Sequence, residues 1–258
     1  MNKISIVLFA VFSMAFVTGT FAGGLPVSAA KKAKRPEKVE FPSRDGLLIS
    51  ANVYEISDGA PVILLCHQAR FNKFEYAGIA RELNKLGFNC IAIDQRSGGP
   101  ISNQPNETNL RARKAGKPTS YLDAEQDILA AIDYVSDRYE KPLILWGSSY
   151  SSTLALYIAA SNDKVSAAVS FSPGNYFADK KGSLIDILST FKKPMFITSS
   201  KEEIKYIDEL LRKMTLNDKQ VHFKPEGKGY HGSRSLWQGM VGGEEYWNAI
   251  RSFLEKLR

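Results

Sequence analysis

Short, wholly apolar runs alternate with stretches of helical periodicity along most of this chain, and this alternation constrains the fold more than any other feature. The run at 62–66, Val-Ile-Leu-Leu-Cys, is apolar at every position, which is typical of a strand buried on both faces of a sheet. Further strands are predicted at 90–93, 142–146, 165–171, 194–198 and 220–223. Apolar residues recur at helical spacing within 76–86, 128–135, 153–158, 204–211 and 246–257. Repeated strand–helix units predict an α/β domain with a mostly parallel central sheet and helices on both faces.

Two segments depart from this alternation. Residues 38–55 are predicted to form a hairpin with its turn at Ser43-Arg44-Asp45-Gly46. Residues 95–119, rich in Gly, Pro and Asn, predict a long irregular loop beyond the carboxyl end of a strand, where long loops often border active sites. The loop carries five cations that could attract a carboxylate-bearing substrate, although a solvated loop with ordinary basic residues is the simpler interpretation. They are Arg96, Arg111, Arg113, Lys114 and Lys117.

The first thirty residues have the organisation of a secretory signal peptide. Met1-Asn2-Lys3 is short and basic, the segment 4–16 is almost wholly apolar, and small residues follow towards Ala22 and Ala29. The apolar core is shorter than the ~20 residues that a membrane span needs, which favours cleavage after Ala22 or near Ala29 over an uncleaved anchor. We therefore expect a secreted or periplasmic protein with no stable membrane insertion after cleavage.

The basic charge of the chain is concentrated near its N-terminus. The formal net charge is +7, but residues 31–39 carry +4 of it, and Lys3 carries one more. Residues 40–258 are thus left with +2, so the charge does not indicate a nucleic-acid partner. Residues 31–39 are predicted to be a basic, flexible leader.

The sequence after residue 40 contains no repeat and no internal linker. The segment 40–258 is therefore predicted to be one domain.

Neither cysteines nor histidines predict a metal or a disulfide. Cys66 ends one predicted strand and Cys90 begins another, so parallel strands would hold the two sulfurs at opposite ends of the sheet, too far apart to bridge. The three histidines form no cluster with metal-ligand spacing. We therefore expect two buried thiols and no metal or other cofactor.

The segment Gly147-Ser148-Ser149-Tyr150-Ser151 is the strongest chemical motif. It lies between a predicted strand and a predicted helix, the setting of a nucleophile elbow, in which a serine hydroxyl is raised at the carboxyl edge of the sheet. Ser149 is the serine that this pattern indicates as nucleophile. A capping role for Ser148, Ser149 and Ser151 at the following helix is the alternative that the motif alone leaves open.

A serine nucleophile needs a base, and a base needs an acid that orients it. His231 lies in the glycine-flanked segment Gly229-Tyr230-His231-Gly232 after the last predicted strand, where the chain returns to the carboxyl edge. His222 lies within a strand and is predicted to be structural, and His67 is predicted to shape the loop after residues 62–66.

The acid is expected after the strand at 194–198. Glu203 is favoured over its neighbour Glu202 by the usual spacing, and Asp179 is a weaker third candidate. Two backbone N–H groups are expected to bind the oxyanion, those of Tyr150 and Ala69. The assignment of these two donors rests on their positions alone.

These motifs resemble the α/β-hydrolase superfamily, and within it the small dienelactone-hydrolase-like proteins. The resemblance covers residues 38–258 and implies the α/β-hydrolase fold, with Ser149 as nucleophile, His231 as general base and Glu203 as acid. Two positions depart from the family pattern: Ser151 replaces the second glycine of the elbow, and Gln68 follows His67 where glycine is frequent. The short segment between residues 172 and 194 predicts a minimal lid. The motifs are Leu65-Cys66-His67-Gln68, Asp94-Gln95-Arg96-Ser97-Gly98-Gly99, Gly147-Ser148-Ser149-Tyr150-Ser151 and Tyr230-His231-Gly232.

The sequence thus predicts a serine hydrolase that cleaves small-molecule carboxylic esters through an acyl-enzyme. A serine peptidase or amidase using the same triad is the nearest alternative. A non-catalytic binding protein of the same fold is the other, and the serine at position 151 motivates it. The acyl length, the natural substrate and the oligomeric state have no signature in the sequence.

Overall fold

The computed structural model describes residues 35–101 and 103–258. The predicted signal peptide at 1–30, and the leader up to residue 34, lie outside these described residues. Strand β1 begins at Glu37, so the folded domain starts inside the segment predicted as a leader, ahead of residue 40. The reason is local: Phe41 is buried and stacks on Tyr134 with ring centroids 4.5 Å apart, and partly buried Val39 packs against the same core.

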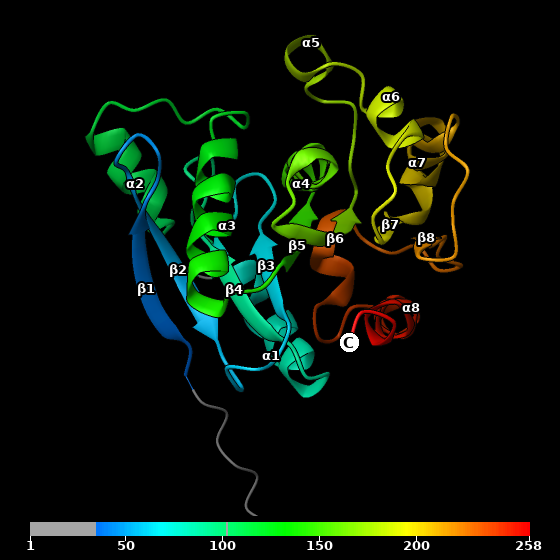
Figure 1. The fold of residues 1–258 in the computed structure, drawn as a ribbon, viewed down its shortest axis with the longest axis horizontal. Coiled ribbons are helices and arrows are strands. Elements are labelled where there is room, and N and C mark those ends of the chain that lie inside the picture. Colours follow the sequence, from blue (N-terminus) through cyan, green and yellow to red (C-terminus); the bar gives the residue numbers. More distant parts are fainter. Residues whose placement is uncertain (1–34, 102) are drawn as a thin grey trace, which may run out of the picture. The chain divides into compact units, whose positions relative to one another are not determined.

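The described residues form one eight-stranded sheet in the order β1-β2-β4-β3-β5-β6-β7-β8, as Figure 1 shows. The β1–β2 hairpin and its junction with β4 are antiparallel, and every other pairing is parallel. The predicted mostly parallel α/β architecture is therefore confirmed. The strands are β1 Glu37–Pro42, β2 Leu48–Tyr54, β3 Val62–Cys66, β4 Asn89–Ile93, β5 Leu143–Ser148, β6 Val165–Phe171, β7 Met195–Thr198 and β8 Gln220–His222.

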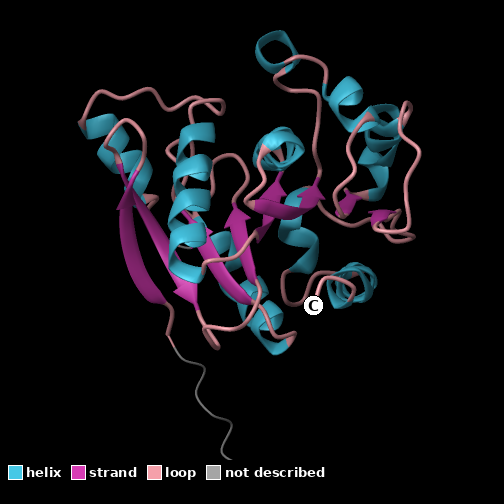
Figure 2. Ribbon diagram, viewed as in Figure 1, coloured by secondary structure: helices cyan, strands magenta, loops and turns pink. Residues whose placement is uncertain are grey.

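Helices cover both faces of this sheet (Figure 2). The core on one face includes residues of α2, α3, α4, α6 and α7, and the core on the other face includes residues of α1 and α8. The helices are α1 Ala77–Lys85, α2 Glu107–Lys114, α3 Glu125–Tyr139, α4 Tyr150–Ser161, α5 Ala178–Lys181, α6 Leu184–Ser189, α7 Ile204–Leu211 and α8 Gly243–Glu255. Three 3₁₀ segments accompany them: η1 Lys73–Tyr76, η2 Lys201–Glu203 and η3 Gly232–Leu236.

The central strands explain why the sheet needs both helical layers. Successive side chains of a strand point to opposite faces, and in β3 Leu64 joins one core while Ile63 and Leu65 join the other. All five side chains of β3 are buried. A strand with no polar face is stable only when both faces are covered, and the unbroken apolar run in the sequence has this cause.

The segment 95–119 is not irregular throughout, and the sequence-based prediction is wrong there. Helix α2 lies within it, and the Asn106 side chain caps the helix by accepting the N–H of Asn109 at 2.8 Å. The helix was not recognised because its sequence carries few apolar residues from which a helical period could be read. Its position depends instead on a polar cluster.

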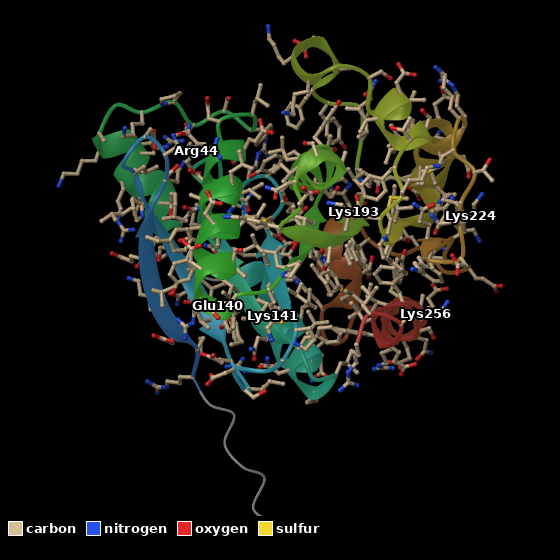
Figure 3. The ribbon with its side chains drawn as sticks, in the orientation of Figure 1. Arg44, Glu140, Lys141, Lys193, Lys224 and Lys256 are labelled. Carbon is tan, nitrogen blue, oxygen red and sulfur yellow. The ribbon has the colours of Figure 1, made fainter. Side chains whose placement is uncertain are left out.

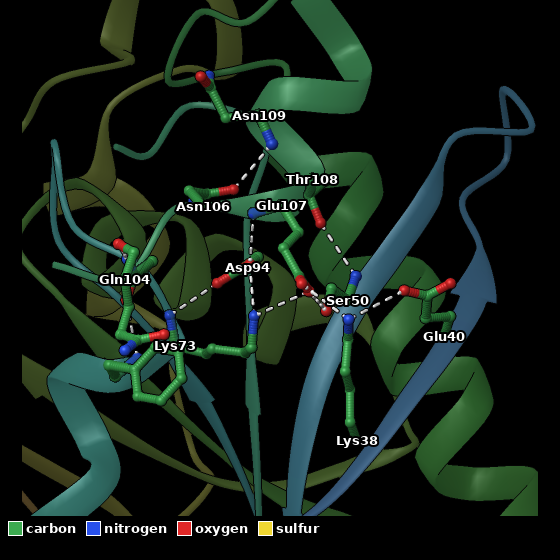
Figure 4. Close-up of polar contacts among 12 residues, drawn as sticks. Lys38, Glu40, Ser50, Lys73, Asp94, Gln104, Asn106, Glu107, Thr108 and Asn109 are labelled. Atoms are coloured by element: carbon green, nitrogen blue, oxygen red, sulfur yellow. Dashed lines mark hydrogen bonds and ion pairs between the residues drawn. The ribbon is translucent and has the colours of Figure 1, made fainter. Parts of the chain in front are cut away.

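Figure 4 shows this cluster, which joins α2 to the sheet and to η1. The buried Lys73 ammonium lies 2.7 Å from Asp94 and 3.3 Å from Glu107. The backbone N–H of Glu107 also donates to Asp94, at 2.9 Å. Although partial burial opposes ionisation of Glu107, hydrogen bonds from Lys38 and Ser50 and the Lys73 charge lower its pKa to about 2. The first turn of α2 is thereby held by charged contacts rather than by apolar packing.

Cys66 and Cys90 are free and buried, as predicted. They lie on neighbouring parallel strands, where Cys66 pairs with Ile93 and Cys90 with Ile63, so the thiols are at opposite ends of the pair.

Lys193, labelled in Figure 3, stabilises the turn between α4 and β6. Its Nζ donates to backbone carbonyls on both sides of this turn, at 2.7 and 2.8 Å. Within residues 35–101 and 103–258, no helix has the length and apolarity needed to cross a bilayer.

Candidate active site

Ser149 occupies a sharp turn between β5 and α4. Its backbone has φ 58° and ψ −127°, and a positive φ is uncommon for any residue other than glycine. The Ser149 N–H donates to the carbonyl of Phe171 at the end of β6, at 2.7 Å. A Cβ at Gly147 would lie 2.4 Å from backbone atoms of the first turn of α4, so glycine is required for this close approach. The turn therefore has the strained strand-to-helix geometry of a nucleophile elbow.

Ser151, which stands where the pattern has its second glycine, has its side chain buried at the junction with β3. Its hydroxyl lies 2.7 Å from the His67 carbonyl and 2.8 Å from the Cys66 carbonyl, and accepts the Ser148 N–H at 3.2 Å. The hydroxymethyl group is thus accommodated by hydrogen bonds. It connects the elbow to the residues that enter the predicted oxyanion loop.

His231 lies directly beside the elbow. Its Nε2 is 2.8 Å from the Ser149 hydroxyl. The following residue, Gly232, has φ 69°, and a Cβ there would lie 2.4 Å from the Ser148 hydroxyl. A side chain at position 232 would push the loop away, so the glycine after the histidine permits the close approach.

Glu203, rather than Glu202, faces the imidazole. The Glu203 carboxylate lies 2.6 Å from Nδ1 of His231, whereas Glu202 is exposed. A carboxylate only accepts hydrogen bonds, so Nδ1 carries the proton and Nε2 is free to accept the one on Ser149. Burial opposes ionisation of Glu203, but the hydrogen bond and the charge of His231 outweigh it and lower the pKa of Glu203. Ser149, His231 and Glu203 form a continuous hydrogen-bonded chain.

Ser172 was not recognised from the sequence. Its hydroxyl donates to the second oxygen of Glu203 at 2.8 Å and accepts the Gly232 N–H at 2.9 Å, so it fixes both the carboxylate and the histidine loop. Its backbone has φ 57°, a second non-glycine residue in the left-handed region at this edge of the sheet. The only available signal was its place directly after strand β6.

The remaining sequence candidates lie elsewhere or have other partners. Asp179 is on α5, exposed, 3.8 Å from Lys180, and is not part of the chain of hydrogen bonds to His231. His222 ends β8 and lies 3.7 Å from Asp208. His67 is fully buried, with Nδ1 donating to the Gln68 carbonyl at 2.8 Å and Nε2 accepting the Gln95 N–H at 2.9 Å. Burial lowers the pKa of His67 to about 4, so the ring stays neutral and holds the loop after β3.

The two expected oxyanion donors lie on either side of Ser149. Tyr150 follows it in the chain, and Ala69 follows the strand next to the one that ends at the elbow. Tyr150 is the first residue of α4, where backbone N–H groups have no partner within a helix. Ala69 follows β3, the strand next to β5. Within the part of the chain that the structure describes, neither N–H donates to any acceptor. Both remain available for a developing negative charge, and their role as oxyanion donors is a proposal.

A buried carboxylate, Glu75 of η1, lies beneath this site, and the sequence showed no sign of it. It is 1% exposed and accepts the Gln68 N–H at 2.8 Å, which ties the residue before Ala69 to the core. Burial, opposed by the hydrogen bonds from Gln68 and Ser148, raises the pKa of Glu75 to about 7. Glu75 therefore anchors the start of the predicted oxyanion loop through its hydrogen bond with Gln68.

Four of the five cations of segment 95–119 are held by partners of their own. Arg96 is fully buried between Asp127, at 2.7 Å, and Asp45, at 2.9 Å. Arg111 pairs with Glu40, Arg113 donates to Asn109, and Lys117 lies 3.3 Å from Asp45. They do not form a free cationic rim, and the fully buried Arg96 is not the solvated residue that the simpler interpretation expected. Among the described residues, no group of His, Cys, Asp and Glu could hold a metal ion.

Comparisons with known proteins give a consistent picture. A model of the Dienelactone hydrolase family matches residues 49–224. No curated protein sequence matches the chain. An esterase from Pyrococcus furiosus, Pf2001, superimposes with a TM-score of 0.65 and 19% identity over 86% of this chain and 92% of its own. The esterase domain of a Rhodothermus marinus protein gives a TM-score of 0.62 with 16% identity, over 86% of this chain and 99% of its own.

A third solved structure with the same fold is named as a peptidase. It is the Pyrococcus horikoshii acylaminoacyl peptidase, with a TM-score of 0.60 and 17% identity. The match covers 87% of this chain but 42% of that one. At these identities the three structures establish a shared fold, and the choice between ester and amide substrates depends on the site itself.

Proposed function

Because this chain belongs to the dienelactone hydrolase family, as its motifs predicted, we propose that it cleaves carboxylic esters through an acyl-enzyme formed on Ser149. Family membership makes it a serine hydrolase; the ester preference and the residue roles are the proposal. One observation carries it: Ser149, His231 and Glu203 lie in a hydrogen-bonded chain with separations of 2.8 and 2.6 Å, on a strained elbow. Nucleophile, base and orienting acid are thus aligned for acyl transfer.

Acylation begins at the Ser149 hydroxyl. As its oxygen attacks the ester carbonyl, Nε2 of His231 takes the proton, and the Glu203 carboxylate stabilises the imidazolium that forms. The N–H groups of Tyr150 and Ala69 bind the negative oxygen of the tetrahedral intermediate. When the intermediate collapses, the carbonyl–oxygen bond to the alcohol breaks, and His231 returns its proton to the leaving alkoxide.

Deacylation repeats these roles with water. His231 removes a proton from a water molecule that attacks the acyl carbonyl, and then protonates Ser149 as the acid product leaves. The charges balance at each step, so the residues described need no metal or cofactor for this chemistry. Two short helices, α5 and α6, follow β6, so the substrate approaches without a large covering domain.

The proposed place of action is outside the cytoplasm. The basic start, apolar segment and small residues of the first thirty positions support export with cleavage after Ala22 or near Ala29. Expression of the full chain in a bacterial host, followed by mass measurement of the exported protein, should give an N-terminus at one of these places. Retention of Met1 in an exported product would contradict cleavage.

An active-site probe tests the catalytic proposal directly. A fluorophosphonate, which phosphonylates an activated serine, should label the mature protein at one site and abolish hydrolysis of p-nitrophenyl acetate. Ser149→Ala should lose both labelling and hydrolysis, and in the triad of subtilisin such a loss reaches about 10⁶-fold in kcat. Ser148→Ala, which keeps the nucleophile, is the matched control and should still be labelled.

The outcomes separate the alternatives. Labelling that survives in Ser149→Ala would remove Ser149 as the nucleophile. A wild-type protein that neither reacts with the probe nor hydrolyses esters would instead be a binding protein of this fold. Hydrolysis of aminoacyl p-nitroanilides in preference to p-nitrophenyl esters would show an amidase or peptidase.

A further inference from the structure

A cavity of about 480 Å³ opens beside the hydrogen-bonded chain. Its walls come from the loop after β6, from α6 and from α7. The lining residues used below are Tyr176, Ile185, Glu203, Tyr206, Glu209 and Leu210. The volume lies in the range of small-molecule sites, about 300–1,000 Å³.

The cavity meets the hydrogen-bonded chain at its acid, Glu203. Glu203 lines it and also holds His231. Ser172 lines it too, and its hydroxyl donates to Glu203 and accepts the N–H of Gly232, the residue after His231. Tyr176 belongs to the same wall, and partial burial and the Glu203 charge raise its pKa. A group joined to an ester carbonyl at Ser149 can extend directly into this space.

The walls are apolar and aromatic. Ile185 and Leu210 are buried, while Tyr176 and Tyr206 are 51% and 58% exposed. Exposed aromatic surface around a cavity favours an apolar or aromatic ligand that removes it from water. Tyr176 also has a defined place, because a Cβ at Gly174 would lie 2.5 Å from its ring. The ring thus packs against the backbone of Gly174.

The charged side chains that line the cavity are both carboxylates, those of Glu203 and Glu209. Arg212 pairs with Glu209 one turn further along the chain. Lys205 lies 5.0 Å from the centre of the Tyr206 ring, but neither cation is among the lining residues. An anionic group in this space would meet two lining carboxylates and no lining cation, and although Arg212 offsets part of the Glu209 charge, the field disfavours it.

We propose that this cavity is a substrate subsite that takes an uncharged aromatic or branched apolar group of the ester and rejects a carboxylate. The inference rests on the proposed ester hydrolysis at Ser149 and names its substrate class. The apolar group can belong to the acyl part or to the alcohol, and both would be recognised by the same walls. The experiment separates these two sources.

Two matched ester series with purified mature protein test the subsite. The acyl series compares methyl acetate, methyl 3-phenylpropionate, methyl valerate and monomethyl succinate; the alcohol series compares ethyl acetate with phenethyl acetate. The kcat/KM of each is measured by titrating the released acid. We expect the phenyl member of at least one series to exceed its small counterpart by about tenfold or more, since even one methylene in an apolar pocket changes rates about 10- to 200-fold. Monomethyl succinate should fall about tenfold or more below methyl valerate.

Variants link these preferences to the cavity. Tyr206→Ala should lower the phenyl-to-small kcat/KM ratio about tenfold in the preferred series. Glu209→Gln should raise the ratio of monomethyl succinate to methyl valerate about three- to tenfold, because it removes one of the two negative charges while keeping the shape. Glu202→Gln removes an exposed charge that does not line the cavity and should leave every ratio within about twofold of wild type.

Each result decides the question. A phenyl preference in the acyl series places the acyl group in the cavity, and one in the alcohol series places the alcohol there; both support the subsite. Ser149-dependent hydrolysis with no phenyl preference in either series, or with ratios that Tyr206→Ala leaves unchanged, overturns the subsite but not the proposed function. If no ester is hydrolysed, the proposed function fails and the subsite fails with it.

Discussion

At the scale of single residues, two adjacent glutamates in η2, just before α7, have different surroundings. Glu203 holds Nδ1 of His231 and receives the Ser172 hydroxyl, whereas Glu202 is exposed to solvent. The two differ in direction because η2 turns the backbone between them. Replacing each carboxylate by its amide changes charge and hydrogen bonding with little change in shape.

Glu203→Gln should lower kcat for p-nitrophenyl acetate by about 10²- to 10⁴-fold, because the amide no longer fixes the Nδ1–H tautomer or stabilises the imidazolium. Glu202→Gln should retain wild-type kcat within about twofold, because that side chain is exposed and screened by solvent. Steady-state kinetics of both purified variants provide the measurement. Equal losses in the two variants would show that the acid is not Glu203.

Glu75 presents a different situation, because it is a buried carboxyl group that forms no ion pair with any cation in the described part of the chain. Its pKa is raised to about 7 from the ordinary value of 4.5, mainly by burial. Below pH 4.5 the group is protonated in both folded and unfolded chains. Between pH 4.5 and 7 the unfolded chain loses this proton while the folded protein keeps it, so the folded state is progressively destabilised as pH rises.

Glu75→Gln should remove this dependence. Relative to the variant, the wild type should lose about 3 kcal/mol of unfolding free energy as pH rises from 4.5 through 7, with a slope of at most about 1.4 kcal/mol per pH unit, and the loss should level off above pH 7. Urea unfolding at a series of pH values gives the difference, and Glu255→Gln, at an exposed position on α8, is the control. Parallel curves for wild type and Glu75→Gln would contradict the raised pKa.

At the scale of elements, the junction between α4 and β3 depends on a side chain that the elbow pattern does not predict. The Ser151 hydroxyl lies between the carbonyls that end β3 and the backbone of the elbow. Helix α4 and the predicted oxyanion loop are thereby connected independently of the strand pairing. The hydroxyl is fully buried, so water cannot replace it at these carbonyls.

Ser151→Ala should therefore cost about 1–3 kcal/mol, the penalty for leaving a buried carbonyl without its donor. Ser166→Ala is the matched control: its hydroxyl also donates to a carbonyl, that of Leu143 at 3.1 Å, but at an exposed position. We expect it to change the unfolding free energy by about 0.5 kcal/mol or less. Chemical denaturation followed by tryptophan fluorescence measures both, and equal effects would show that Ser151 is not a structural link.

At the scale of the whole molecule, Arg96 joins three segments that are far apart in the sequence. Its guanidinium contacts Asp45 in the β1–β2 turn and Asp127 in α3, and its own backbone follows β4. The antiparallel edge of the sheet and the helical layer are thus held together by one buried cation. Its hydrogen bonds and ion pairs with the two carboxylates keep it charged despite burial, so the pKa of Arg96 is raised.

Asp127→Ala should destabilise the fold by about 3–5 kcal/mol, because it leaves a buried cation with a single partner. Lys117→Ala removes a partly exposed ion pair with Asp45 and should cost about 1 kcal/mol or less. Urea denaturation of the two variants and wild type gives the comparison. A loss in Asp127→Ala no larger than that in Lys117→Ala would show that the buried ion pair does not support the architecture.

The elements that could be predicted from the sequence are those whose signal is local. The strands at 62–66 and 165–171 and the helix at 204–211 have the predicted bounds, because an apolar run and a 3.6-residue period reflect burial on two faces or on one. Helix α2 escaped prediction because charged contacts hold it. Glu75 and Ser172 escaped because nothing in the local sequence distinguishes a buried carboxyl or a left-handed serine.

The sequence by itself determined the α/β class, the family and the three side chains that meet at the carboxyl edge, since strand order and chain order bring their loops to one place. Only the tertiary structure decided which charges are free. It paired Arg96, Arg111 and Lys117 with carboxylates, turned Glu203 towards His231, buried Glu75, and left an aromatic cavity with two lining carboxylates open beside Glu203. The physical reason is that the effect of a charge depends on its partners and its distance from water, and both are set by residues distant in the chain.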